Sequence, residues 1–170
     1  MQLLPMPSED FDRFFSALCE EFCEAERRDR DDARALLING KYSVYEISKD
    51  GVSVGYTALW ALPSAVFVEH FVILPEYRNR GYGSEVISRL KSKFPQIILE
   101  VEPPTNEPGR RRLDFYKRLG FYEQQEPYLQ PSYRKGGAAV PLKIMSWPKP
   151  LQSFSDTVAE IYATVYGIKR

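Results

Sequence analysis

Apolar positions recur along the chain with two different periods, and these predict a mixed α/β fold. The first helical pattern begins after Ser8, a residue type that can cap a helix. Its apolar positions are Phe11, Phe14, Phe15, Leu18, Cys19, Phe22 and Cys23. They recur at intervals of three and four residues, which is typical of a helix with one buried face. We therefore expect both cysteines to be buried free thiols, since successive turns of one helix are a poor place for a disulfide.

Three strand-like segments follow this helix. Residues 42–48 lead into Asp50-Gly51, which is a strong signal for a two-residue hairpin turn. Residues 52–62 then alternate between large apolar residues and smaller or more polar ones, and residues 66–74 form a further apolar run. The three segments predict an antiparallel meander.

The second half of the chain alternates helical and strand-like patterns. The expected elements are helices over about 83–94, 111–119 and 152–167, and strands over 96–102, 121–128 and 140–147, with a short first strand over 1–6. A helix between strands 66–74 and 96–102 predicts one parallel pair of strands. The fold class is therefore α/β (α+β): a mostly antiparallel sheet of six to seven strands flanked by helices.

The length of 170 residues fits one domain of ordinary size. Two prolines, Pro148 and Pro150, interrupt the chain after the last expected strand. We expect a single domain over residues 1–147 and a C-terminal helical extension over residues 148–170. The extension packs either on its own domain or on a dimer partner, and the sequence leaves both open.

Composition and charge exclude several classes of protein. The chain is 44% hydrophobic, which is enough for a core, and its formal net charge is zero, which argues against non-specific nucleic-acid binding. No window approaches the roughly 20 apolar residues that span a bilayer, and the N-terminal residues do not resemble a secretory signal. Two cysteines alone make no zinc site, so we expect no metal, and free thiols fit a reducing cytoplasm.

The most informative stretch is the turn between strand 66–74 and the following helix. Its sequence is Arg78-Asn79-Arg80-Gly81-Tyr82-Gly83-Ser84. Glycine allows close backbone approach, and the start of a helix aims several N–H groups and the positive end of the helix dipole at one spot. The arginines can meet phosphate oxygens. The turn is thus a phosphate site or a plain strand-to-helix turn with solvated arginines. A nucleotide-binding P-loop is disfavoured because no G-x-x-x-x-G-K-[ST] run occurs.

These residues carry a resemblance to the GNAT superfamily of acyl-CoA-dependent N-acetyltransferases. The signature of that family is Arg or Gln, two residues, Gly, one residue, and Gly or Ala, and residues 78–83 match it. Residues 115–121, Phe-Tyr-Lys-Arg-Leu-Gly-Phe, are a second family-like segment, and the order of elements agrees over about residues 40–147. The resemblance implies a fold in which the fourth and fifth strands splay apart.

The resemblance also implies coenzyme A as the cofactor, bound as acetyl-CoA. The N–H groups of about residues 80–84 would hold its pyrophosphate, and the backbone of residues 71–73 would pair with its pantetheine arm. The expected cofactor-binding residues are Phe71, Val72, Ile73, Arg78, Asn79, Arg80, Gly81, Tyr82, Gly83, Ser84 and Tyr116. Many family members have Asn and a small residue where this chain has Gly109 and Arg112. Contacts from that segment to the arm are therefore in doubt, and Arg111 or Arg112 can serve the cofactor or the acceptor instead.

Acetyl transfer to an amine needs a base for the amine, stabilisation of the oxyanion and an acid for the departing thiolate. The resemblance implies Tyr116 as the acid and the backbone N–H of Ile73 as the group that polarises the thioester carbonyl. Packing at a helix–sheet junction is the alternative role of Tyr116. Glu69 is the best candidate for the base, because burial in an apolar strand would raise its pKa. It could instead bind the amine or be a paired structural acid.

Alternation along a strand places Glu69, Phe71 and Ile73 on one face. His70, the one histidine of the chain, then faces the other side, as a base or in a structural role.

The next strand carries two further carboxylates, Glu100 and Glu102. They could bind a cationic amine or pair with Arg111 or Arg112. We expect substrate binding from Glu69 and Glu100, and from Tyr128 and Tyr133 of a loop that borders the acceptor site.

The predicted function is transfer of an acetyl group from acetyl-CoA to a primary amine of a small molecule or peptide. Transfer within a ternary complex is favoured because no nucleophilic Cys or Ser arrangement is evident. The alternative is an acyl-CoA-binding regulatory module without turnover. The expected partners are acetyl-CoA and the amine, without nucleic acid or membrane, and a homodimer is left open.

Overall fold

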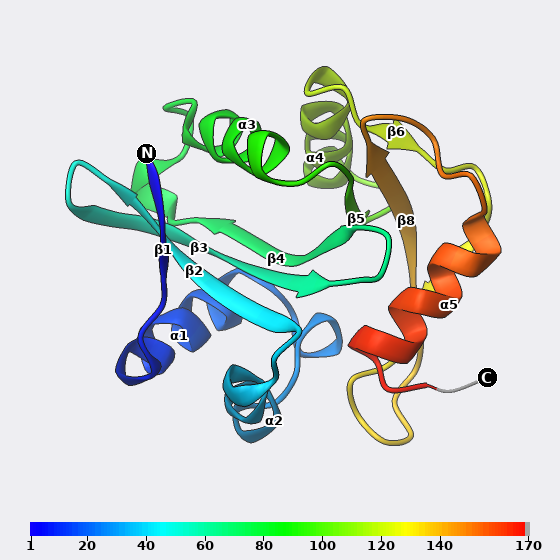
Figure 1. Ribbon diagram of the computed structural model, residues 1–170, viewed down its shortest axis with the longest axis horizontal. Helices are drawn as coiled ribbons and strands as arrows, with labels where there is room; N and C mark the ends of the chain where they lie inside the picture. The colour runs from blue at the N-terminus through cyan, green and yellow to red at the C-terminus, as the bar shows by residue number, and fades with distance from the viewer. Residues whose placement is uncertain (169–170) are drawn as a thin grey trace.

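The computed structural model describes residues 1–168 and shows one mixed sheet with helices on both faces (Figure 1). The strands are β1 (Gln2–Pro5), β2 (Tyr42–Lys49), β3 (Val52–Ala61), β4 (Val66–Ile73), β5 (Ile97–Val101), β6 (Tyr122–Glu123), β7 (Tyr128–Gln130) and β8 (Val140–Trp147). They lie in the order β1-β2-β3-β4-β5-β8-β6, and β7 pairs with β8 beside this path. Only β4 and β5 pair in parallel within the described chain. The predicted fold class is confirmed, although the sheet has eight strands because residues 121–128 do not form one continuous strand.

The longer helices are α1 (Phe11–Glu21), α2 (Arg30–Ala35), α3 (Tyr82–Lys93), α4 (Glu107–Arg118) and α5 (Phe154–Val165). In Figure 1, α3 and α4 cover one face of the sheet, α1 and α2 lie on the other, and α5 lies beside β8. The helix predicted over 111–119 begins at Glu107 instead. Asn106 caps it by accepting a hydrogen bond from the Gly109 N–H at 2.8 Å. Pro108 occupies the first turn, where a backbone N–H would have no partner within the helix, so the missing N–H of proline does no harm.

Two apolar cores lie on the two faces of the sheet. Phe11 and Phe14 of α1 share one core with Val158 and Ile161 of α5, so the C-terminal helix packs against its own chain. Residues 169–170 of the predicted extension lie outside the described residues. The second core lies beneath α3 and α4. Over residues 1–168, no helix is both long and apolar enough to cross a membrane.

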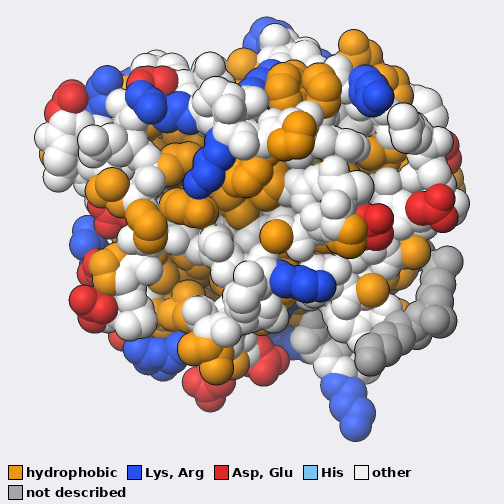
Figure 2. Space-filling view, in the orientation of Figure 1, with side chains coloured by type: hydrophobic (Ala, Val, Ile, Leu, Met, Phe, Trp, Pro, Cys, Tyr) orange, Lys and Arg blue, Asp and Glu red, His pale blue; other side chains and the backbone are white. Residues whose placement is uncertain are grey.

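The two cysteines are exposed, so the prediction that they are buried was wrong. Helix α1 ends at Glu21, and its buried residues are Phe11, Phe14, Ala17 and Leu18. The apolar stripe therefore stops before Cys23, and Cys19 lies outside it. The face of the molecule seen in Figure 2 mixes basic and acidic side chains, in keeping with a formal net charge of zero.

The parallel pairing of β4 and β5 is short, and this positions the site. It joins residues 66–68 to residues 97–99 and then stops. Beyond this point β4 runs on to Ile73, and β5 no longer pairs with its second edge. Glu69 and Glu100 are the first residues after the pairing ends, so two carboxylates stand where the strands begin to part.

Candidate active site

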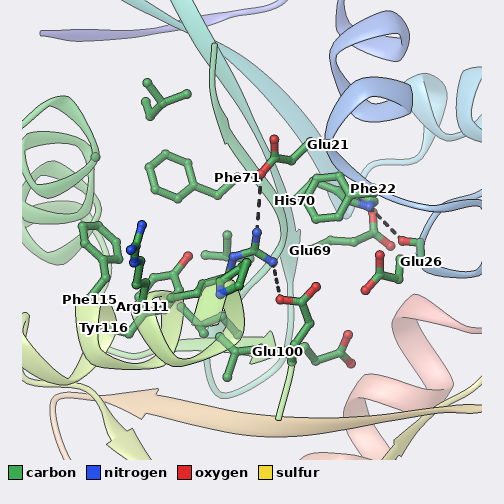
Figure 3. A pocket seen from close by; sticks show the side chains of 18 of the residues that line it. Glu21, Phe22, Glu26, Glu69, His70, Phe71, Glu100, Arg111, Phe115 and Tyr116 are labelled. Carbon is green, nitrogen blue, oxygen red and sulfur yellow. Dashed lines mark hydrogen bonds and ion pairs between the residues drawn. The ribbon is translucent and has the colours of Figure 1, made fainter. Parts of the chain in front are cut away.

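A cleft of about 720 Å³ opens where β4 and β5 part. Its walls come from the end of β4, the turn into α3, β5, α4 and the end of α1, with further residues from around β7 and β8. Figure 3 shows labelled carboxylates, aromatic rings and an arginine gathered around it. Residues that are far apart in the sequence therefore face one space.

The turn from β4 into α3 forms one end of this cleft. Asn79 and Gly81 both have positive φ angles, 60° and 79°, which turn the chain sharply into the helix. The first intrahelical hydrogen bond runs from the Glu85 N–H to the Gly81 oxygen, so the N–H groups of residues 82–84 precede it and have no partner within the helix. Apart from Gly81 and its two neighbours in the chain, no described residue has an atom within 4 Å of the position that a Cβ on Gly81 would take. This open space and these N–H groups fit a phosphate group.

Gly83 has a different role in the same turn. A Cβ there would lie 3.2 Å from the ring of Phe115 in α4, so glycine lets the first turn of α3 pack closely against α4. This close packing holds the end of the cleft that fits a phosphate group against the helix that carries Tyr116.

The two arginines of the turn already have partners. The Arg78 guanidinium donates hydrogen bonds to the Ile73 oxygen at 2.9 Å and to the Glu21 carboxylate at 2.5 Å. Arg80 lies over the ring of Tyr77, 5.6 Å from its centroid. Arg78 thus ties the end of β4 to the end of α1, a connection that the sequence does not reveal.

Arg112 of α4 extends this set of contacts. Its guanidinium donates to Glu102 at 2.7 Å and to Glu21 at 3.4 Å, so Glu102 has the arginine partner that was one of the two roles left open for it. Arg111 pairs with Glu107 of its own helix at 2.8 Å. Glu21, which no sequence signal singled out, thereby joins Arg112 to the β4 side of the cleft.

Tyr116 lines the cleft from α4 and is 7% exposed. The rings of Phe115 and Phe121 pack edge-on against it, with centroids 5.1 and 5.5 Å away. Burial raises the pKa of Tyr116 to about 12, because a phenolate is poorly solvated there. The hydroxyl therefore keeps its proton at neutral pH.

The predicted alternation of side chains along β4 was wrong at Glu69. The register with β3 moves from Ala58 opposite His70 to Leu59 opposite Val68, so Glu69 has no partner residue on β3. This β-bulge interrupts the strict alternation of faces. As a result Glu69 Oε2 lies 3.5 Å from His70 Nδ1, and both residues line the cleft.

The expected rise in the pKa of Glu69 was also wrong. Burial is the largest single effect and raises it, since the side chain is 1% exposed, but the Arg28 guanidinium forms an ion pair with Oε1 and opposes the effect of burial. Together with the nearby His70, it lowers the pKa of Glu69 to about 2. Tyr133 also donates a hydrogen bond to Oε1, at 3.2 Å. Glu69 is therefore a permanent carboxylate at neutral pH.

Glu100 has the property expected of Glu69. Burial raises its pKa to about 7, against the opposite effect of hydrogen bonds from the Tyr128 and Tyr166 hydroxyls. The Tyr166 hydroxyl lies 3.1 and 3.0 Å from the two carboxylate oxygens of Glu100. Tyr128 is 3% exposed and supports Glu100 by a hydrogen bond to Oε1, while Tyr133 itself lines the cleft.

Comparison with known proteins now identifies the family. The model of the Acetyltransferase (GNAT) family matches residues 7–121. The chain belongs to the GNAT acetyltransferase family. YjbC of Bacillus subtilis (strain 168), provisionally named an acetyltransferase, is 28% identical over 111 residues. That match covers 62% of this chain and 56% of YjbC, so this chain spans little more than half of the length of that relative.

Solved structures agree with this assignment. A GNAT-family protein of Bacteroides thetaiotaomicron, also provisionally named an acetyltransferase, is 28% identical, with a TM-score of 0.93 over 99% of this chain and 100% of that one. The provisionally named acetyltransferase yncA of Salmonella typhimurium was solved with its cofactor acetyl-CoA. It is 15% identical with a TM-score of 0.59, covering 89% of this chain and 96% of its own, and shows likeness of fold alone.

Part of the site of this GNAT chain lies outside the matched segment. Tyr128 of β7, Tyr133 after it and Tyr166 after α5 all follow residue 121, and the last two reach the two cleft carboxylates. The hydroxyls of Tyr133 and Tyr166 also lie 3.4 Å from each other. Within residues 1–168, no group of three or more His, Cys, Asp or Glu side chains is arranged to hold a metal ion.

Proposed function

We propose that this GNAT protein transfers the acetyl group of acetyl-CoA directly to a primary amine in a ternary complex. One observation carries the proposal. The open glycine turn at the start of α3, the buried Tyr116 and the carboxylates of Glu69 and Glu100 all line a single cleft. A donor that binds the turn and an acceptor that binds the carboxylates would therefore meet inside it.

The donor end can be assigned to particular groups. Acetyl-CoA supplies, when bound, an acetyl group activated as a thioester. The N–H groups of residues 82–84 would bind its pyrophosphate, as helix N-termini bind phosphate generally. Over residues 71–73, β4 has a backbone edge with which β5 does not pair, and this edge would pair with the amide-rich arm. The side chain of Val72 is buried in the core, so Val72 would contribute through its backbone alone. The N–H of Ile73 would polarise the thioester carbonyl.

The free energy of proton transfer favours Glu100 over Glu69 as the base. An alkylammonium titrates at about 10.4, so moving its proton to a carboxylate of pKa about 7 costs about 5 kcal/mol. Moving it to Glu69, with a pKa of about 2, costs about 11 kcal/mol. An ordinary turnover of about 10 per second corresponds to a total barrier of about 16 kcal/mol, into which the smaller cost fits easily. We assign proton removal to Glu100 and binding of the positive charge to Glu69.

Tyr116 would act on the departing sulfur. A thiol has a pKa of about 8.5, well below the pKa of about 12 for Tyr116. The phenol therefore keeps its proton and stabilises the developing thiolate as a hydrogen-bond donor, rather than releasing the proton completely.

Steady-state assays with a panel of primary amines test the proposal. Free coenzyme A would be measured as a thiol, and the acetylated amine would be identified by mass. We expect saturable turnover with equal amounts of both products for at least one aliphatic amine. Tight binding of acetyl-CoA without acetylation across the panel would contradict the proposal and favour a regulatory module.

A further inference from the structure

A chain of ion pairs connects the ends of β4 and β5 beyond the point where the strands part. The Arg78 guanidinium donates to the oxygen of Ile73, the last residue of β4, and to the Glu21 carboxylate. Glu21 also accepts from Arg112 at 3.4 Å, and Arg112 donates at 2.7 Å to Glu102, which directly follows β5. All five residues line the cleft. Two strands that no longer pair there are thus connected again through side chains.

The contact between Glu21 and Arg112 reaches from one face of the sheet to the other. Arg112 belongs to α4, which covers one face, whereas Glu21 ends α1, which lies on the opposite face (Figure 1). In Figure 3 the labelled Glu21 comes from the side of α1 and the labelled Tyr116 from the side of α4, with the cleft between them. The Arg112 guanidinium therefore lies between the parted ends of β4 and β5.

The path proposed for the donor runs through the same place. Its pyrophosphate would bind at residues 82–84, and its thioester would lie between the N–H of Ile73 and the hydroxyl of Tyr116. Arg112 stands one helical turn before Tyr116, on the same face of α4. The amide-rich arm between the two ends of the donor must therefore pass Arg112. The ion pair of Arg112 with Glu21 lies across this path.

The exposure of this ion pair indicates that it can separate. The side chains of Arg112 and Glu21 are 34% and 22% exposed. Such a pair contributes little to stability, because water solvates both groups when they move apart. The ion pair of Arg28 with Glu69 is different, since its side chains are 11% and 1% exposed. Of these two ion pairs in the cleft, the pair of Arg112 with Glu21 separates at the lower cost.

We propose that the ion pair of Glu21 with Arg112 is a gate, which closes the gap between β4 and β5 in the free protein and separates to admit the arm of acetyl-CoA. This inference rests on the proposed function, because it takes acetyl-CoA as the donor, and it adds control of donor entry. Neither side chain loses its last partner when the gate opens, since Arg112 keeps Glu102 and Glu21 keeps Arg78. A protein that binds a ligand only in its open state binds it more weakly in proportion to the closed fraction.

Stopped-flow association with etheno-coenzyme A, a fluorescent form of the cofactor, tests the gate. Glu21→Gln and Arg112→Gln each remove one charge of the ion pair, and they change the net charge of the protein in opposite directions. We expect both variants to bind etheno-coenzyme A about threefold faster than the wild type, which corresponds to the loss of one partly exposed ion pair.

An effect of charge alone would give a different pattern. Coenzyme A is an anion, so electrostatic attraction alone would make Glu21→Gln faster and Arg112→Gln slower. Glu107→Gln and Arg110→Gln, at exposed positions that do not line the cleft, measure this effect of charge by itself. Association of Arg112→Gln that is no faster than that of the wild type overturns the proposal.

A second variant keeps the test decisive if Arg112→Gln does not fold. Arg112→Lys retains the charge but lacks the planar fork that bonds two carboxylates at once. It should also bind etheno-coenzyme A faster than the wild type, and an unchanged rate would overturn the proposal.

Acetylation of a primary amine, measured on the same wild-type sample, separates the gate from the proposed function. Acetylation together with association rates that follow charge alone would overturn the gate and leave the proposed function standing. Faster association of both variants without acetylation of any amine would support the gate and contradict the proposed function. If none of the proteins bound etheno-coenzyme A, both would be contradicted.

Discussion

Replacing Glu100 by Gln should lower activity and at the same time stabilise the fold at alkaline pH. The pKa of Glu100 is raised from 4.5 to about 7, mainly by burial. In the folded protein Glu100 therefore holds its proton more tightly than in the unfolded chain. Its contribution to stability is fully present below about pH 4.5 and is lost as the pH rises through about 7.

The size of this effect follows from the same two values. Each pKa unit corresponds to about 1.4 kcal/mol, so the wild type loses about 3 kcal/mol between acid and alkaline pH that the variant does not lose. For a chain of this length, about 3 kcal/mol corresponds to roughly 6–12 °C in melting temperature. The Gln carbonyl can still accept hydrogen bonds from Tyr128 and Tyr166, so the change is mainly electrostatic.

Denaturant unfolding of both proteins at about pH 5 and pH 8 measures this quantity, with Glu126→Gln as the exposed control. The difference in the free energy of unfolding, variant minus wild type, should grow by about 2.5 kcal/mol between pH 5 and pH 8, because a small part of the effect is already present at pH 5. The kcat should fall by a factor of about 10² to 10⁴, as expected for loss of a general base. A stability difference that does not change with pH would refute the raised pKa. An unchanged kcat would refute the assignment of Glu100 as the base.

Three other substitutions test separate parts of the site. Tyr116→Phe should lower kcat by roughly 10- to 100-fold without raising KM, because it removes a hydrogen bond made to developing charge; an unchanged kcat in steady-state assays would exclude that role. Tyr166→Phe removes a hydrogen-bond donor to both oxygens of Glu100, so the inflection in the plot of kcat/KM against pH should move upward from about 7. An inflection that stays in place would show that the Tyr166 hydroxyl does not lower the pKa of Glu100. Gly81→Ala should weaken acetyl-CoA binding in calorimetry, because φ is 79° there and a residue with a side chain costs about 1–2 kcal/mol in that backbone conformation. Gly40→Ala is the control, and equal affinities of the two variants would argue against the turn as the phosphate site.

The fold could be predicted where local pattern and tertiary structure agree. The hairpin at Asp50-Gly51 and the strand-turn-helix around Gly81 carry local signals, because their φ angles favour particular residue types. The helix predicted over 111–119 begins too late, because a proline usually interrupts a helix, whereas Pro108 fits the first turn that Asn106 caps.

The electrostatics of the site could not be predicted because they depend on contacts between distant residues. The β-bulge at Glu69 could not be predicted from alternation, because alternation assumes that every residue of a strand has a partner on the neighbouring strand. Arg28, which lowers the pKa of that carboxylate, stands 41 residues earlier in a charged segment that carries no distinguishing signal. Tyr166 reaches Glu100 from 66 residues later in the chain, through the packing of α5. Arg28 lowers the pKa of Glu69 and burial raises the pKa of Glu100, so the raised pKa expected of Glu69 belongs to Glu100 instead.

A quench experiment with acetyl-labelled acetyl-CoA follows the acetyl group during its proposed direct transfer to an amine. Protein and labelled acetyl-CoA are mixed with and without n-butylamine, quenched, and analysed for label on the protein, on the amine and in free acetate. Direct transfer predicts one labelled acetylbutylamine for each coenzyme A released when the amine is present, and no label on the protein in either sample. Label bound covalently to the protein, or release of coenzyme A without labelled amine, would contradict it.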